Sequence, residues 1–187
     1  MSTRVERLDP EREPDFRRVH DDEHGLGWCH CVAWWTEDWE RWGERTAEEN
    51  RALREDLFRR GEHDGYLAYR EDRPVGWCQV GRRDRLTKLV REAGLEPDEG
   101  AWAITCFAVV PAERRRGVAR GLLAHALADL DGRGVPRVEA FPRTEEGEAG
   151  ELWTGPAALF RSFGFRCVAR GERRSVWRLE LGDRDSR

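Results

Sequence analysis

The sequence lacks any long apolar run, and its mean hydropathy is -0.82. A transmembrane helix needs about 20 consecutive, mostly apolar residues. The chain begins Met-Ser-Thr-Arg-Val-Glu-Arg, which contains no apolar core of a secretory signal peptide. We therefore expect a cytoplasmic protein that does not act at a membrane.

No charge of one sign dominates the chain, because 33 Lys and Arg residues stand against 37 Asp and Glu residues, for a net charge of -4. The two signs are interspersed, so the concentrated basic surface of a nucleic-acid-binding protein is missing. Internal repeats and interdomain linkers are absent from the sequence as well. A chain of 187 residues can bury one core of its own. We predict a single domain over residues 1–182 and a disordered polar tail over 183–187.

The five cysteines form no Cys-x-x-Cys pair, and their number is odd. Cys29 and Cys31 flank His30, but a structural zinc site needs four ligands. Cys78 or Cys106 would complete such a site only if the fold brought them close. We therefore expect reduced thiols and no metal, with a thiol or metal module as an alternative function.

One stretch predicts a strand, a basic turn and a helix in succession. Residues 101–110 are nearly all apolar or small, which is typical of a strand buried on both faces, and Pro111 ends it. After Gly117 the apolar positions fall at helical spacing, which predicts a helix over about 115–131, with Gly132 just past its end. Similar patterns predict strands at 4–8, 66–70, 75–80, 137–141, 165–168 and 175–181, and helices near 10–20, 47–60, 86–93 and 156–163.

The turn after residue 110 has the composition of an anion site. Gly117 and Ala119 place small side chains at the first turn of the predicted helix, where backbone N–H groups have no helical partner and the dipole is positive. A phosphate can approach such a backbone closely, so the pattern predicts a site suited to a pyrophosphate. The alternative is an ordinary connection with solvated side chains of Arg114, Arg115, Arg116 and Arg120.

The motif Val109-Val-Pro111 followed by Arg114-x-x-Gly117-x-Ala119 resembles the acetyl-CoA signature of the GNAT (Gcn5-related N-acetyltransferase) superfamily. The predicted order of elements is similar to that of the family over nearly the whole chain. The resemblance implies an α/β (α+β) fold with a mixed, mostly antiparallel sheet of about seven strands and helices on both faces. It further implies that the parallel strands at 101–110 and 137–141 splay around CoA.

The resemblance also implies where acetyl-CoA binds. The exposed strand backbone near Phe107 and Val109 would pair with the pantetheine arm, in the manner of an added strand. The N–H groups over 114–119 would hold the pyrophosphate. The implied cofactor-binding residues are Phe107, Ala108, Val109, Arg114, Arg115, Arg116, Gly117, Val118, Ala119 and Arg120.

The catalytic groups depart from the family pattern. The segment 158–165 resembles the family's L-Y-x-x-x-G-F segment, but Phe160 stands where a tyrosine would protonate the leaving thiolate. Glu139, on the next strand, is the best acid–base candidate, and its alternative role is that of a salt-bridged or surface glutamate. Further alternatives are His24 or His30 as the base and Cys106 as an acyl-carrying nucleophile.

Five of the nine tryptophans fall between Gly25 and Gly43. So many aromatic side chains in one irregular segment either pack on the core or form the wall of a pocket. In the resembled fold this region borders the acceptor site. The candidate substrate-binding residues are Trp28, Trp34, Trp35 and Trp39.

These observations favour an acetyl-CoA-dependent N-acyltransferase that moves an acetyl group by direct transfer to a small-molecule or peptide amine. The identity of that amine and the formation of a homodimer stay open. The alternative is a non-catalytic sensor of acyl-CoA or another small molecule on the same fold, because Phe160 has no proton to give and no base is evident.

Overall fold

The structure is a computed structural model, and it describes residues 3–21, 27–144 and 153–182. The predicted tail at 183–187 and the candidate base His24 lie outside these ranges. None of the helices within them has the length and apolar character that crossing a bilayer would require.

Seven strands form one sheet in the order β1-β2-β3-β4-β5-β7-β6. All neighbours are antiparallel except β4 and β5, which run parallel. This topology confirms the predicted fold class. The strands are β1 (Arg4–Arg7), β2 (Asp64–Arg70), β3 (Arg73–Arg82), β4 (Ala101–Val109), β5 (Arg137–Ala140), β6 (Arg166–Arg170) and β7 (Ser175–Glu180).

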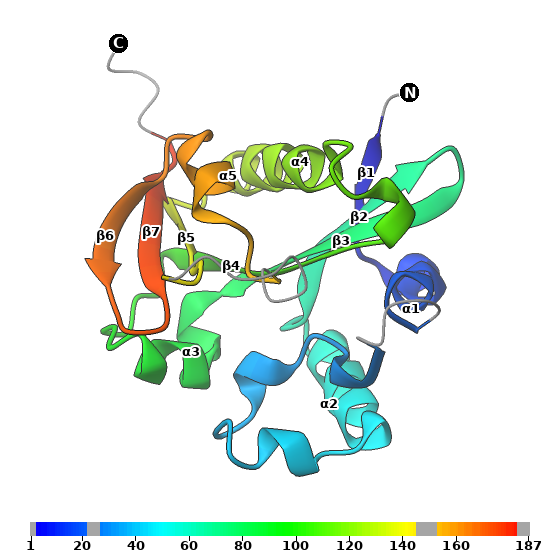
Figure 1. The fold of residues 1–187 in the computed structure, drawn as a ribbon, viewed down its shortest axis with the longest axis horizontal. Helices are drawn as coiled ribbons and strands as arrows, with labels where there is room; N and C mark the ends of the chain where they lie inside the picture. The colour runs from blue at the N-terminus through cyan, green and yellow to red at the C-terminus, as the bar shows by residue number, and fades with distance from the viewer. Residues whose placement is uncertain (1–2, 22–26, 145–152, 183–187) are drawn as a thin grey trace.

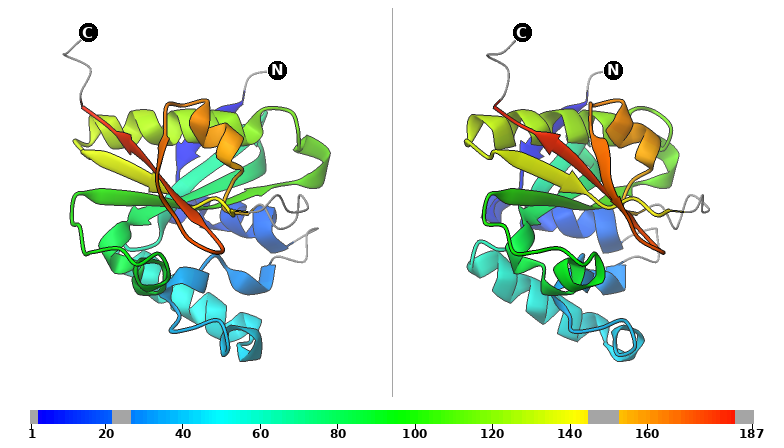
Figure 2. Two further views of the ribbon diagram at one scale, coloured as in Figure 1. Left: turned by 60° about the vertical axis from the view of Figure 1, so that its left-hand side comes forward. Right: turned by 90° about the vertical axis from the view of Figure 1, so that its left-hand side faces the viewer.

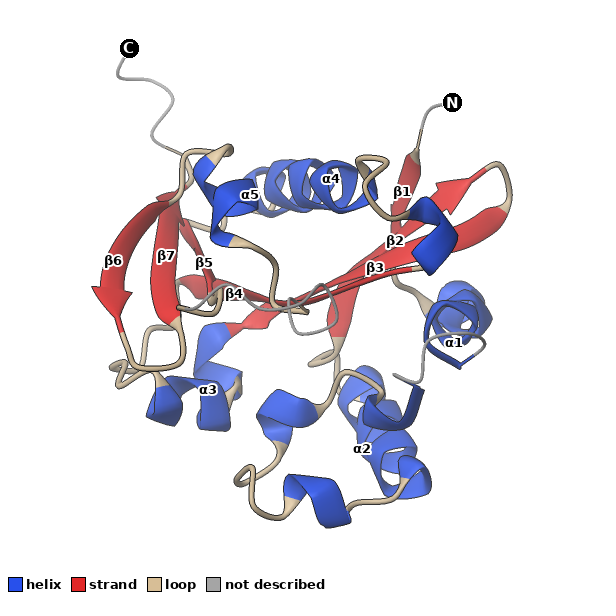
Figure 3. Cartoon of the chain, viewed as in Figure 1, coloured by secondary structure: helices blue, strands red, loops and turns tan. Residues whose placement is uncertain are grey.

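Helices cover both faces of the sheet. Figure 1 and, by secondary structure, Figure 3 show α4 and α5 over one face and α1 and α2 beneath the other, and Figure 2 shows the same layers from two further sides. Three short 3-10 turns lie between α1 and α2, in the tryptophan-rich segment. The helices are α1 (Glu13–Asp21), α2 (Ala47–Arg59), α3 (Thr87–Glu92), α4 (Val118–Gly132) and α5 (Ala157–Arg161).

The strands divide their side chains between two cores, as alternation along a strand requires. On β2, Tyr66 and Ala68 are buried in the cluster that includes the apolar face of α4. Leu67 and Tyr69 are buried on the opposite face, with Phe16 of α1. The central layer is therefore apolar on both faces, as the composition of the predicted strands indicates.

The predicted bounds of the central helix were wrong at both ends. α4 begins at Val118, because Gly117 has a φ of +82° and so stands outside the right-handed helix as its N-cap. The helix continues through Gly132, and the left-handed residue that follows its end is Gly134, with a φ of +73°. The turn between strand and helix is therefore longer than the apolar spacing suggested.

The sheet opens between β4 and β5. Their pairing runs only from Ala101 opposite Arg137 to Ile104 opposite Ala140. On the other edge of β4, Val80 faces Ile104 but Gln79 faces Cys106, so Thr105 is an extra residue that forms a β-bulge. Beyond this bulge β4 keeps β3 as a neighbour and has lost β5, and this is where the candidate site lies.

Candidate active site

The open edge of β4 carries two backbone positions that face away from β3. The N–H of Val110 donates to Val75 O on β3, so by alternation the backbone groups of Phe107 and Val109 point into the opening. The Phe107 N–H donates to Trp153 O at 2.6 Å, and Val109 O accepts from Arg114 Nε at 3.1 Å. The Val109 N–H has no partner among the described residues. Of the two strand amides implied for the pantetheine arm, one is therefore engaged by the chain itself.

The turn before α4 presents six consecutive amides without a protein partner. The N–H of Arg114 donates to Pro111 O, and the next paired amide in the chain is Gly121, which donates to Gly117 O at 2.9 Å. Within the described ranges no hydrogen bond is found for the N–H groups of residues 115–120. Two left-handed residues, Arg115 with a φ of +58° and Gly117, shape this run. Successive unpaired amides in a turn at a helix N-terminus form an anion-binding concavity.

A buried carboxylate braces the turn from beneath. Glu113 is 5% exposed and lies 2.9 Å from Arg70 Nε and 3.6 Å from Arg116 Nη1. Arg70 also donates from Nη2 to the carbonyl of Arg116 at 3.1 Å. These contacts fix the backbone of the turn while the side chains of Arg114 and Arg115 stay exposed. The predicted basic turn therefore combines a fixed backbone with exposed positive charge.

Phe160 occupies an apolar position beside the opening. It is fully buried on α5, with its ring centroid 6.2 Å from that of Phe107 and 5.4 Å from that of Phe165. Gly155 lets these rings approach the backbone, since a Cβ there would lie 2.9 Å from Phe160 Cζ and 3.1 Å from Phe107 Cε2. The position that the family motif assigns to a proton donor is filled by a packing residue.

Glu139 is locked inside the sheet. Its side chain is 0% exposed, and both carboxylate oxygens are taken by arginines from other elements. Oε2 accepts from Arg83 Nη1 at 2.9 Å, and Oε1 accepts from Arg178 Nε at 2.9 Å and Nη2 at 2.8 Å. A general base must reach the proton it removes. This geometry matches the salt-bridged alternative and not a group that contacts an acceptor.

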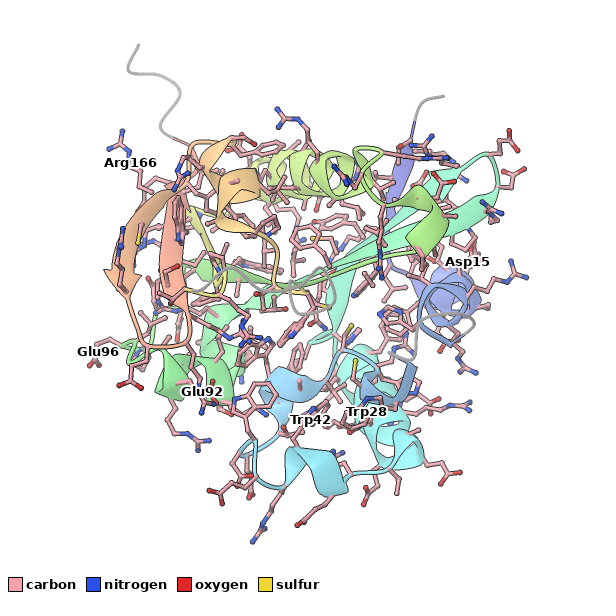
Figure 4. All side chains as sticks on the ribbon, in the orientation of Figure 1. Asp15, Trp28, Trp42, Glu92, Glu96 and Arg166 are labelled. Atoms are coloured by element: carbon pink, nitrogen blue, oxygen red, sulfur yellow. The ribbon has the colours of Figure 1, made fainter. Side chains whose placement is uncertain are left out.

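The tryptophans of the segment before α2 do not form one wall. Trp34 is 1% exposed and packs with Phe141 and Val176 at the carboxyl end of β5. Trp28 is 36% exposed, its ring centroid lies 4.7 Å from that of Trp42 with the two planes tilted by 38°, and Figure 4 shows this pair next to α2 and below the sheet. Trp34 is therefore the member of the predicted set that lies nearest the opening.

Sequence reasoning missed a tryptophan that does border the opening. The Trp153 ring lies 5.6 Å from that of Trp34, and its carbonyl is the acceptor for Phe107 N–H. Its position directly before Thr154 and Gly155, ahead of α5, was the signal available in the sequence. The Trp35 ring contacts a different partner, His63, with the two ring centroids 5.9 Å apart.

The Trp39 ring contacts the ammonium group of a lysine of the same chain. Lys88, the only lysine of the sequence, is 1% exposed, and its Nζ lies 3.7 Å from the Trp39 ring centroid. Nζ donates to Thr36 Oγ1 at 2.7 Å and to Asp38 O at 3.2 Å, so its hydrogen-bond partners are neutral oxygens. Trp39 thus anchors the segment to α3 and does not offer this face to an acceptor.

Three of the five cysteines, Cys29, Cys31 and Cys106, lie together on one face of the sheet, whereas Cys78 is in the other core and Cys167 is exposed on β6. Cys31 Sγ lies 3.1 Å from His20 Nε2 and 3.5 Å from Cys106 Sγ. Hydrogen bonds of the Cys31 thiol with Cys106 and Cys29, together with burial, raise its pKa well above the ordinary value, so this thiol stays protonated. No group of three or more potential metal ligands is found in the part of the chain that the structure describes. This arrangement gives the alternative of a metal module no support.

A strand edge without a neighbour can pair with an extended ligand, and unpaired amides at a helix N-terminus can bind an anion. The sequence model of the acetyltransferase (GNAT) family matches residues 28–165. The chain belongs to the GNAT family of acetyltransferases. A search of curated proteins found no match.

Solved structures of acetyltransferases share the fold. An acetyltransferase from Thermus thermophilus is 19% identical with a TM-score of 0.61, and the match covers 97% of this chain and 98% of that one. The PaiA N-acetyltransferase of Thermoplasma acidophilum, in complex with coenzyme A, is 11% identical with a TM-score of 0.60, over 97% and 100% of the two chains. A GNAT acetyltransferase from Brucella melitensis, in complex with acetyl-CoA, is 16% identical with a TM-score of 0.54, over 97% and 89%.

We predict that Glu139→Gln lowers the free energy of unfolding by about 3–5 kcal/mol, because it leaves Arg83 buried without its charge partner. The matched control is Glu180→Gln, whose side chain is 54% exposed and pairs with Arg137 at 3.8 Å. The Glu180→Gln substitution should lower the free energy of unfolding by less than about 1 kcal/mol. Urea unfolding measures both values. A stable Glu139→Gln protein that has lost turnover would instead identify Glu139 as the base.

Lys88 predicts a specific pH dependence of stability. Burial lowers the pKa of Lys88 to about 8, whereas a lysine in an unfolded chain titrates near 10.4. Between these values the unfolded state binds more protons than the folded state, so the contribution of this group to stability rises with pH. Urea unfolding on either side of this window should show the rise in the native protein and its loss in Lys88→Met. The contributions of groups that titrate in both the native protein and Lys88→Met cancel in the difference between their stabilities. An identical pH dependence of stability in the two proteins would therefore contradict the lowered pKa of Lys88.

Proposed function

We propose that the protein transfers an acetyl group from acetyl-CoA to an amine. The observation that carries this function is the run of six unpaired amides over 115–120, next to a β4 edge that has lost its neighbour. Coenzyme A or acetyl-CoA is bound in two proteins of the same fold, those of Thermoplasma acidophilum and Brucella melitensis. The geometry of this chain fits such a cofactor, since an anion and an extended arm are what these two features can take.

The residues of the turn divide the work of binding. Amides 115–120 would hold the diphosphate, and the exposed side chains of Arg114 and Arg115 would add charge around it. The side chain of Val118 is buried against β3, where a Cβ on Gly76 would lie 2.7 Å from its Cγ1, so Val118 would contribute its amide alone. Further along the edge, the Val109 N–H would pair with the pantetheine arm.

When bound, acetyl-CoA supplies an acetyl thioester, and transfer of its acetyl group to an amine releases the free thiol. Phe160 offers no acid, and a thiol with a pKa of about 8.5 leaves without one more readily than an alcohol would. Both oxygens of Glu139 are occupied, so the chain would act mainly by holding the reactants together. The same features favour the second candidate, a sensor that binds acyl-CoA without turnover.

Binding is tested by thermal or urea unfolding with acetyl-CoA. At a concentration 100 times Kd, the ligand should add about 2.7 kcal/mol to the free energy of unfolding. Gly117→Asp should lower the affinity about tenfold or more, because it places negative charge at the diphosphate. Gly117→Asn is the matched control of nearly equal shape, both residues tolerate a positive φ, and no atom lies within 4 Å of a Cβ at this position. Equal affinities for the two variants, or no shift at millimolar acetyl-CoA, would refute the site.

Turnover is tested by following free thiol in the presence of a broad panel of amines. The enzyme predicts steady thiol release with at least one amine, and a rate that rises with pH as the amine loses its proton. The sensor predicts the binding shift described above without thiol release for any amine. Thiol release in the native protein that persists unchanged in Gly117→Asp would show that the reaction occurs elsewhere.

A further inference from the structure

An arginine at the start of β7 lies beside the opening in the sheet. Arg174 Nη1 donates to Thr154 Oγ1 at 3.0 Å and lies 3.4 Å from the carbonyl of Phe141, the residue that follows β5. Thr154 is the neighbour of Trp153, whose carbonyl accepts from Phe107 on β4. The guanidinium is therefore tied through one short segment to the strand edge that the proposed acetyl donor would use.

Two indole rings hold this guanidinium in place. The Arg174 Cζ atom lies 5.2 Å from the Trp34 ring centroid and 4.9 Å from that of Trp153. Contacts of this kind favour a cation over an aromatic face. Burial lowers the pKa of Arg174 to about 10, which leaves the group charged at neutral pH but poorly solvated.

Arg174, which is half-buried, differs from the two arginines that are fully buried. Arg54 lies 2.6 Å from Glu13, and Arg83 lies 2.9 Å from Glu139. Across residues 3–21, 27–144 and 153–182, no carboxylate lies within 4 Å of Arg174. The charges that act on its pKa include Arg143 and Arg173, which lower it, against the single acid Glu92.

The free edge of the guanidinium has the geometry of a carboxylate-binding fork. The hydrogen bonds of Arg174 use Nη1, so the edge formed by Nε and Nη2 has no partner among the described residues. Elsewhere in the chain this same edge binds carboxylates: Arg7 presents Nε and Nη2 to Asp64 at 3.0 and 2.7 Å, and Arg82 presents them to Asp84 at 3.1 and 2.9 Å. A planar fork of two donors matches the two oxygens of a carboxylate.

We propose that Arg174 binds a carboxylate of the acceptor, so that the substrate class is an amine that also carries a carboxylate, such as an α-amino acid. This inference rests on the proposed acetyl transfer. The indole of Trp153, which is half-buried, would contact the apolar part of the acceptor. Arg174 acts here as a specificity-determining residue, and the rate of the chemical step would depend on it only through positioning.

The test compares α-amino acids with their α-amides, which lack the negative charge. We expect the native protein to prefer the acids, and Arg174→Gln to lower kcat/KM for the acids about 10- to 100-fold, the range for a lost hydrogen bond to a charged group. The amides should change less than about threefold. Arg174→Lys keeps the charge but not the fork and should fall between the two. Arg166→Gln is the control, because this exposed arginine lies on β6 at the outer edge of the sheet (Figure 4).

A binding measurement gives a readout apart from turnover. Tryptophan fluorescence should change when an α-amino acid or its N-acetyl product is added, because two indoles flank Arg174, and Arg174→Gln should weaken this binding about 10- to 100-fold. The rival partner is a glutamate of the chain itself, since residues 145–152 include Glu145, Glu146, Glu148 and Glu151. In that case Arg174→Gln would lower the melting temperature and leave the preference between acids and amides unchanged.

The outcomes separate this inference from the proposed function. Absence of acetyl-CoA binding, together with absence of thiol release, refutes the acetyltransferase and leaves the binding titration to decide on the carboxylate. Turnover in which acids and amides are used equally, or in which Arg174→Gln affects both to the same degree, overturns the role of Arg174 alone. Failure of every carboxylate-bearing amine to bind at millimolar concentration overturns it in either case.

Discussion

A strand that loses its neighbour must satisfy its backbone groups in another way, and this constraint organises the site. β4 keeps β5 only as far as Ile104, and Phe107 and Val109 then direct their backbone groups into the opening. The carbonyl of Trp153 accepts from the Phe107 amide, and the side chain of Arg114 donates to the Val109 carbonyl. The Val109 N–H and the amides over 115–120 have no partner among the described residues, so they are the groups that a ligand can use.

Local patterns predicted the parts of this site that depend on local geometry. The apolar strand, its end at Pro111 and the unpaired amides around Gly117 follow from residues that are close in sequence. The role of Glu139 does not, because Arg83 and Arg178 come from segments 56 and 39 residues away. A strand glutamate gives no local sign of whether the fold will bring it solvent, substrate or two guanidinium groups.

The tryptophan-rich segment is a second case in which the local sequence does not determine the contacts. Its composition left open whether the indoles pack on the core or line a pocket, because a tryptophan count cannot say which indole faces which partner. Trp39 faces Lys88, Trp28 faces Trp42, and Trp34 faces both Trp153 and Arg174. Cations of the chain itself occupy indole faces that a small-molecule amine would otherwise contact. The contacts of these indoles are therefore contacts within the protein, and they hold the segment against the sheet and α3.

The bulge in β4 connects the tryptophan-rich segment to the open edge of this strand. Thr105, the bulged residue, donates to Gln79 Oε1 at 2.9 Å, and Gln79 Nε2 donates to Cys31 O at 2.8 Å and lies 3.0 Å from His63 Nε2. Burial lowers the pKa of His63 well below its usual range, so this network joins neutral groups and carries no charge of its own. A shift of the tryptophan-rich segment must strain these buried bonds, each of which is costly to leave unmade. The tryptophan-rich segment and the edge of β4 are thus held in one register by neutral hydrogen bonds.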